Sequence, residues 1–232
     1  MILTLNNKKL EKAKQYGIME VGLSLLPYNL ANEKINLCPF STPSCISSCL
    51  NMTGRGSFNR TQESRKLKTL SFLNDRVEFM KKVSAEITYL KSLYSKLAVR
   101  LNVISDINFQ KIKIENNKNI FELHPDVIFL DYTKNPYLIS KHSNYNIIYS
   151  ADKYNITDEM LIKKLKSGQN VAMVFKDKIP AYWNGFEVID GDKSDLEWIN
   201  KKGVISGLIY KKVIKKGVNN QELIKNSTLI YG

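Results

Sequence analysis

The pattern of apolar and polar positions divides the chain into a helical part and a series of short apolar runs. Apolar side chains recur every three or four positions from Phe72 to Leu97, which predicts a helix. Asn74 is its expected cap, with Asp75 and Glu78 in the first turn. Beyond this helix, apolar runs that close on polar residues occupy 97–106, 126–135, 145–152, 170–177, 186–192 and 203–212.

These runs predict an α/β fold. Continuous apolar runs separated by helices, such as the one expected from Thr157 to Gly168, are typical of buried parallel strands. With 18–26 as the first strand, we expect a partial (β/α) barrel or an open parallel sheet. No repeat or Pro/Gly/Ser-rich linker interrupts the chain, so we expect one domain over 1–232, with a cysteine loop at 36–60 after the first strand and a basic C-terminal tail at 201–232.

The ends of the predicted strands carry most of the candidate chemistry. Ligands of parallel α/β sheets bind at the carboxyl ends of the strands. Asp131, Tyr132 and Lys134 offer an acid, a phenol and an amine at one such end and are the candidate catalytic residues. The candidate cofactor-binding residues, which offer charged and hydrogen-bonding groups, are Arg55 of a Gly-Arg-Gly segment together with Arg100, Asn102, Ser105 and Asp106. The alternative for each is an ordinary cap or turn, and for Asp190 and Asp192 a turn is favoured over a magnesium site.

All three cysteines of the chain, Cys38, Cys45 and Cys49, lie between Asn36 and Arg60. The N-terminus does not have the pattern of a secretory signal, so a reducing compartment is expected and clustered cysteines indicate metal ligands rather than disulfides. Structural zinc needs four ligands, and the histidines, His124 and His142, are more than 70 residues away; packing or a turn is the better interpretation of His124. Three thiolates suit a [4Fe-4S] cluster that keeps one iron open. Zinc with three cysteines and one histidine, or three plain thiols, are the alternatives.

The charge of the chain points to polyanionic partners. The formal net charge is +13, from 35 basic and 22 acidic residues. One basic group, residues 55–68, follows the cysteines, and a second lies in the C-terminal tail. Such groups attract nucleic acid by counterion release, although a lysine-rich solvated surface would have the same composition. No apolar run approaches eighteen residues, so we expect no membrane span and a cytoplasmic location.

An α/β partial barrel with three cysteines in the loop after its first strand resembles the radical SAM enzymes. The resemblance implies a [4Fe-4S] cluster on Cys38, Cys45 and Cys49, S-adenosylmethionine bound to the open iron, and an electron donor as partner. The spacing differs: that superfamily usually has C-x3-C-x2-C with an aromatic residue before the last cysteine. This chain has C-x6-C-x3-C, with Ser48 at that place.

Several motifs also resemble the "gene product 88" family of bacteriophage and mobile-element proteins. They are "CPFSTPSCISSCL", "GRG", "KTLSF", "VRLNVISDI", "DYTKNP", "NVAMVF" and "VIDGD", in this order over about residues 20–210. Phe40 departs from the family pattern, which has a small residue there. Membership implies action in a bacterial host cell but does not by itself specify an activity.

Two hypotheses follow. The first is an iron–sulfur enzyme of radical SAM type that acts on a nucleotide, nucleic acid or other macromolecule. The second is a non-catalytic accessory protein that is stabilised by zinc or a cluster and binds nucleic acid. The polar strand ends favour the enzyme. No P-loop, His-Glu-x-x-His, nucleophile elbow or Rossmann fingerprint is present, which sets those classes aside.

Overall fold

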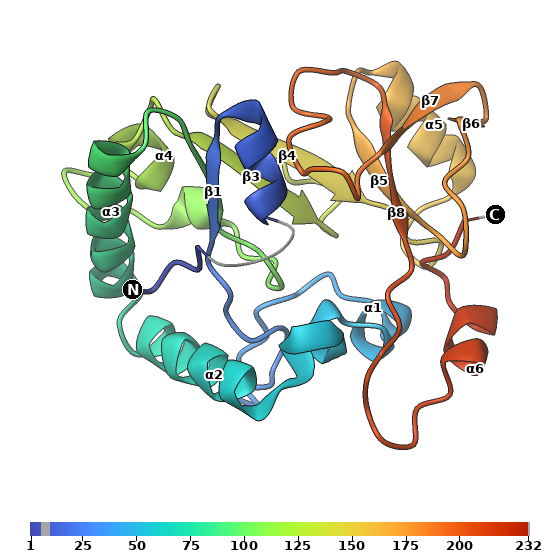
Figure 1. Cartoon of the computed structure of the whole chain (residues 1–232), viewed down its shortest axis with the longest axis horizontal. Helices are drawn as coiled ribbons and strands as arrows, with labels where there is room; N and C mark the ends of the chain where they lie inside the picture. The colour runs from blue at the N-terminus through green and yellow to red at the C-terminus, as the bar shows by residue number, and fades with distance from the viewer. Residues whose placement is uncertain (6–9, 232) are drawn as a thin grey trace.

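The protein is mixed α/β, built on one eight-stranded sheet (Figure 1). The computed structural model describes residues 1–5 and 10–231. The strands are β1 (Met19–Gly22), β2 (Leu97–Arg100), β3 (Ile128–Thr133), β4 (Tyr145–Ser150), β5 (Val171–Phe175), β6 (Tyr182–Trp183), β7 (Phe186–Asp190) and β8 (Ile205–Ile209). Their order is β1-β2-β3-β4-β5-β8-β7-β6. All neighbours are parallel except β6 and β7, and the sheet is open rather than closed into a barrel.

The helices lie between strands along the chain, except the last, which follows β8. They are α1 (Pro43–Ser47), α2 (Asn59–Asn74), α3 (Arg76–Leu93), α4 (Ile120–Leu123), α5 (Asp158–Lys166) and α6 (Asn220–Lys225). Short 3-10 turns add η1 (Leu10–Tyr16), η2 (Leu50–Met52), η3 (Gly54–Ser57) and η4 (Phe109–Lys111). Within the described residues, no helix is both long enough and apolar enough to cross a membrane.

Alternation along the strands gives the sheet two different faces. Phe129 of β3 packs with α3 and α4, and Val171 of β5 packs with α5. The next residues, Leu130 and Ala172, point to the opposite face, where Trp198 and its neighbours cover them. β1 to β5 follow one another in chain order, so right-handed crossovers bring their connecting helices to a single face.

The single helix predicted from Phe72 to Leu97 is wrong: this range covers the end of α2, all of α3 and the first residue of β2. The chain breaks at Asp75, whose extended backbone (φ −148°) ends α2 and begins α3. The Asp75 carboxylate accepts a hydrogen bond from the Glu78 amide at 2.9 Å, so Asp75 rather than Asn74 is the cap. Leu97 already belongs to β2. The predicted helix after Thr157 is confirmed: the Thr157 hydroxyl accepts from the Met160 amide, and Gly168 follows its end with a φ of +84°.

The cysteine segment lies across the carboxyl ends of the parallel strands. The chain leaves β1 through the buried residues Leu23–Leu26, passes through α1 and returns to the sheet only after α2 and α3. In Figure 1, α1 and α6 lie close together on the side where the chain returns from β8. The basic C-terminal segment is therefore not a free tail: it begins with β8 in the sheet and then packs beside the cysteine segment.

Candidate metal centre

Local sequence fixes the three cysteines in different ways. Cys45 lies in α1, which Thr42 caps by accepting from the Cys45 amide at 3.0 Å, with Pro43 in its first turn. Cys49 follows α1 directly and precedes η2. Cys38 is 9% exposed, and its Sγ contacts the Ile104 carbonyl oxygen at 3.7 Å. Cys45 and Cys49 are only half-buried, so the outer side of the site is reachable from solvent.

The three thiols influence one another electrostatically. Burial raises the pKa of Cys38 to about 12, and the charges of Cys45 and Cys49 add to that rise. Burial also raises the pKa of Cys49 to about 11, with Cys45 again contributing. The Tyr28 hydroxyl lies close enough to all three thiols that, after burial, their charges raise its pKa. Each thiol therefore lies within electrostatic range of the other two.

Each thiol also receives a backbone N–H. The amides of Tyr28, Thr42 and Asn51 favour the thiolate forms of Cys38, Cys45 and Cys49 respectively, against the effect of burial. Hydrogen bonds to sulfur are one of the means by which proteins hold and tune thiolate-ligated clusters. These amides offset part of the effect of burial, and the pKa of each thiol nevertheless stays above its ordinary value.

Neither histidine completes a metal site with the thiols. Within the described residues, no group of three or more His, Cys, Asp or Glu side chains gathers around one ion position. His124 pairs with Ser84 at 2.7 Å, and His142 pairs with Asn119 at 3.1 Å. Burial lowers the pKa of His124 to about 4, as suits a packed neutral ring.

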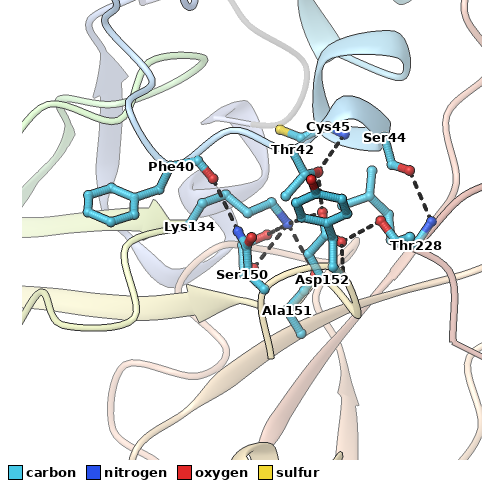
Figure 2. Close-up of polar contacts among 12 residues, drawn as sticks. Phe40, Thr42, Ser44, Cys45, Lys134, Ser150, Ala151, Asp152 and Thr228 are labelled. Carbon is cyan, nitrogen blue, oxygen red and sulfur yellow. Dashed lines mark hydrogen bonds and ion pairs between the residues drawn. The ribbon is translucent and has the colours of Figure 1, made fainter. Parts of the chain in front are cut away.

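Lys134 is the one candidate catalytic residue beside the thiols. It follows β3, and its ammonium donates to the Ser150 and Ala151 carbonyls at 3.0 and 3.1 Å (Figure 2). Burial lowers the pKa of Lys134, and the charges of Cys45 and Asp152 oppose that shift. Conversely, burial raises the pKa of Cys45 and Lys134 opposes the rise. Lys134 thus supplies positive charge that favours the Cys45 thiolate.

Asp152 joins the cysteine segment to both the sheet and the C-terminal segment. It is fully buried after β4 and accepts hydrogen bonds from the hydroxyls of Thr42 and Thr228 at 2.5 Å each (Figure 2). The Lys134 ammonium lies 3.9 Å from its carboxylate. Thr42 is the cap of α1, so the helix that carries Cys45 is held directly by this carboxylate. The buried carboxylate of Asp152 thus contacts the cysteine segment through Thr42, the C-terminal segment through Thr228 and the sheet through Lys134.

Asp131 forms a separate network under the helices. Its carboxylate accepts from the Asn102 amide at 2.6 Å and from the Tyr145 hydroxyl at 3.0 Å. Burial raises the pKa of Asp131 to about 7, although these donors and Arg100 oppose the rise. Ser105 donates to the Asn102 side chain at 3.0 Å. This network shapes the loop after β2.

Asp106 belongs with Lys134 rather than with that network. Its carboxylate accepts from the Thr133 hydroxyl at 2.7 Å and from the Lys134 amide at 2.9 Å. Burial raises the pKa of Asp106. The electrostatic influence of Asp106 on Cys38 and Cys45 places it at the edge of the candidate metal centre.

Arg100 and Tyr132 lie on the opposite face of the sheet. The Arg100 guanidinium forms a buried ion pair with Asp195 at 2.9 Å and lies 4.6 Å from the Tyr132 ring. Tyr132 donates to Asp195 at 2.9 Å. Burial lowers the pKa of Arg100, but Asp195 and Glu20 outweigh this effect and raise it. The structure therefore separates Tyr132 from Asp131, because neighbouring residues of β3 point to opposite faces. Lys134 follows the end of β3, and its ammonium lies at Ser150 and Asp152 rather than at Tyr132.

The remaining sequence candidates lie apart from the thiols or make turns. Arg55 is exposed in η3 and is not near Arg100. Asp190 accepts from the Asp192 amide at 3.0 Å, and Asp192 accepts from the Ile209 amide at 2.9 Å, so the turn interpretation of this pair fits.

Sequence reasoning omitted several residues that hold the site together. The apolar run 145–152 places Asp152 at the end of a strand but does not mark it as a site residue. No sequence pattern assigns a role at the thiols to Thr42, Thr228, Tyr28 or Arg65. The Arg65 guanidinium donates to Asn51 at 2.6 Å, and its charge favours the thiolate of Cys49. The polar ends of the strands could have indicated Asp152. Thr228 is 76 residues away from Asp152 in the chain, and no local pattern marks it.

Comparison with known proteins identifies a family but no activity. No curated protein and no solved structure matches the chain. A profile of the family described as "Gene product 88" matches residues 1–222. The match covers nearly the whole chain, including the cysteine segment and every strand. The chain belongs to the gene product 88 family.

Proposed function

We propose that this protein is an iron–sulfur enzyme of radical SAM type, in which Cys38, Cys45 and Cys49 hold a [4Fe-4S] cluster. The observation that carries the proposal is that the segment with all three cysteines packs on the carboxyl ends of parallel strands, where Thr42 bonds to Asp152 after β4 and Cys38 contacts Ile104 after β2. That edge of a parallel sheet is where α/β enzymes bind their ligands. Three protein ligands leave one coordination position open.

The residues around the thiols have definable roles in this proposal. When bound, the cluster supplies one-electron chemistry and an iron open to an exchangeable ligand, which we take to be S-adenosylmethionine. Lys134 offsets the negative charge of the Cys45 thiolate, and Arg65 does the same for Cys49. Asp152 accepts a hydrogen bond from Thr42 and so fixes the position of α1, the helix that carries Cys45. Because Asp131 and Tyr132 are buried away from the thiols, we assign them supporting roles.

The substrate class in this proposal is a nucleotide, nucleic acid or other macromolecule, and an external electron donor is required. We place the activity in the cytoplasm of a bacterial host cell, as family membership suggests. The alternative is a non-catalytic accessory protein that uses the same thiols to bind a zinc ion or a cluster. The strong positive charge favours that alternative, and its zinc form would lack a histidine ligand, because His124 and His142 pair with Ser84 and Asn119.

The test is spectroscopic. The protein is purified anaerobically, reduced, and its EPR spectrum is recorded with and without S-adenosylmethionine. A reduced-cluster signal that changes on addition of S-adenosylmethionine supports the enzyme. A cluster signal that S-adenosylmethionine does not alter would favour the accessory protein.

Matched variants make the test specific to the three thiols. Replacing Cys38, Cys45 or Cys49 singly by Ala should each remove most of the iron. Ser47→Ala lies in the same helix, is exposed, and bonds only to its own helix at Ser44, so it should retain the iron. Equal iron in all four variants would contradict the ligand set.

A further inference from the structure

Two basic segments that are far apart in the sequence lie side by side in the structure. Thr53 forms an antiparallel bridge with Val213, and the Ile214 amide donates to the Met52 carbonyl at 2.8 Å. The contact is reinforced by the Tyr210 hydroxyl, which lies 3.4 Å from the Ser48 hydroxyl. Residues 210–228 therefore run along residues 44–53, next to the thiols. We call residues 50–70 and 210–228 together the basic surface.

This surface is strongly and almost uniformly positive. It carries ten lysines and arginines against two glutamates, Glu63 and Glu222. Lys211 is paired with Asp192 at 3.0 Å, and Arg65 is partly buried beside Cys49. Of the others, seven are exposed and form no ion pair with any residue that the structure describes: Arg55, Arg60, Lys66, Lys212, Lys215, Lys216 and Lys225. Unpaired exposed cations at this density raise the local concentration of polyanions.

Exposed apolar side chains are interspersed among these cations. Phe58, between η3 and α2, is 60% exposed, and Ile214 is 59% exposed on the segment bonded to Met52. On α2, Leu67 and Leu70 are also exposed, but the exposed Glu63 and Lys66, four residues before them, share that side of the helix, so no continuous apolar face forms. A membrane-surface helix would need such a face. An exposed aromatic ring among unpaired cations is instead the composition of sites that stack bases and track phosphates.

We propose that the basic surface binds single-stranded nucleic acid, with the phosphates on the exposed lysines and arginines and a base against Phe58. A strand bound there passes the half-buried Cys45 and Cys49, which lie on the neighbouring segment. Binding of the nucleic-acid strand depends only on the basic surface and requires no metal at the thiols. That the bound strand is also the substrate rests on the function proposed above.

The test is fluorescence anisotropy with a labelled oligothymidylate of about 20 nucleotides, titrated at several salt concentrations. Lys212→Gln, Lys215→Gln and Lys216→Gln are combined in one variant. Its control replaces three exposed lysines elsewhere, Lys81, Lys118 and Lys141, by Gln. The first variant should lose about tenfold or more in affinity, and the slope of log K against log salt should fall by about 2, whereas the control should bind like the unmodified protein.

A second variant tests the aromatic contact. Phe58→Ala should weaken oligothymidylate binding about fivefold or more while leaving the salt slope unchanged, because it removes stacking and not charge. Thermal unfolding of each variant confirms that its fold is intact. Equal losses in both lysine variants, or binding to anionic phospholipid vesicles but not to the oligonucleotide, would overturn the proposal.

Iron analysis of the same samples separates this proposal from the previous one. Protein that carries iron but does not bind the oligonucleotide overturns the basic surface and leaves the proposed cluster intact. Protein that binds the oligonucleotide but never carries iron supports the basic surface and overturns the proposed enzyme.

Discussion

The buried carboxylate of Asp152 allows the sharpest test of how the cysteine segment is held. It accepts hydrogen bonds from Thr42 and Thr228 and lies 3.9 Å from the Lys134 ammonium, all within the interior. Asp152→Ala removes the acceptor from two hydroxyls and the counter-charge from a buried lysine. Removing one partner of a buried ion pair costs about 3–5 kcal/mol. Because Lys134 keeps its carbonyl partners, we expect a loss of about 3 kcal/mol, at the lower end.

The assay is urea unfolding followed by circular dichroism, with the midpoint and slope fitted for each variant. Asp126→Ala is the matched control, since Asp126 also pairs with a lysine, Lys91, at 2.6 Å, but its side chain is 61% exposed. That control should cost less than about 1 kcal/mol. Should Asp152→Ala cost no more than Asp126→Ala, Asp152 does not hold the cysteine segment. A double-mutant cycle with Lys134→Met would then measure the coupling between the two charges directly.

Three further predictions concern the fold around the site. Burial raises the pKa of Asp131 to about 7 from 3.8, so the folded state holds this proton more tightly, and the Asp131 contribution to stability should fall as pH rises from 4 to 7. Asp131→Asn should flatten the profile of melting temperature against pH over that range, and an unchanged slope would refute the assignment. Gly203 and Gly17 have φ values of +66° and +67°, but a Cβ on Gly203 would lie 2.6 Å from the Leu165 carbonyl oxygen while Gly17 has open space. Gly203→Ala should therefore lower the unfolding midpoint clearly more than Gly17→Ala; equal effects would show that φ alone matters. Thr228→Val should cost about 1–2 kcal/mol and speed proteolytic removal of the C-terminal segment, whereas unchanged proteolysis would mean that this bond does not hold it.

Much of the sheet could be predicted because its strands are short, continuous apolar runs. The β3 run and its polar end at Lys134 come directly from the sequence, as does the position of the cysteines after β1. The same sequence could have separated Asp131 from Tyr132, since adjacent strand residues point to opposite faces. The predicted helix from Phe72 ran through Asp75 because the apolar spacing continues across the break, and only the cap geometry reveals it.

The long-range contacts of the site could not be predicted from local sequence patterns. β8 lies between β5 and β7, so the chain after it returns to the cysteine segment rather than extending as a tail. The contacts Thr228–Asp152 and Ile214–Met52 follow from that topology. They turn two separate basic groups in the sequence into one surface beside the thiols.

Metal analysis of the purified protein shows whether Cys38, Cys45 and Cys49 hold an iron–sulfur cluster. The protein is purified without exposure to oxygen, and iron, acid-labile sulfide and zinc are measured per chain, with an absorption spectrum of the same sample. The account predicts about four irons with matching sulfide and a broad visible absorption that bleaches on reduction. About one zinc per chain with no iron would contradict it.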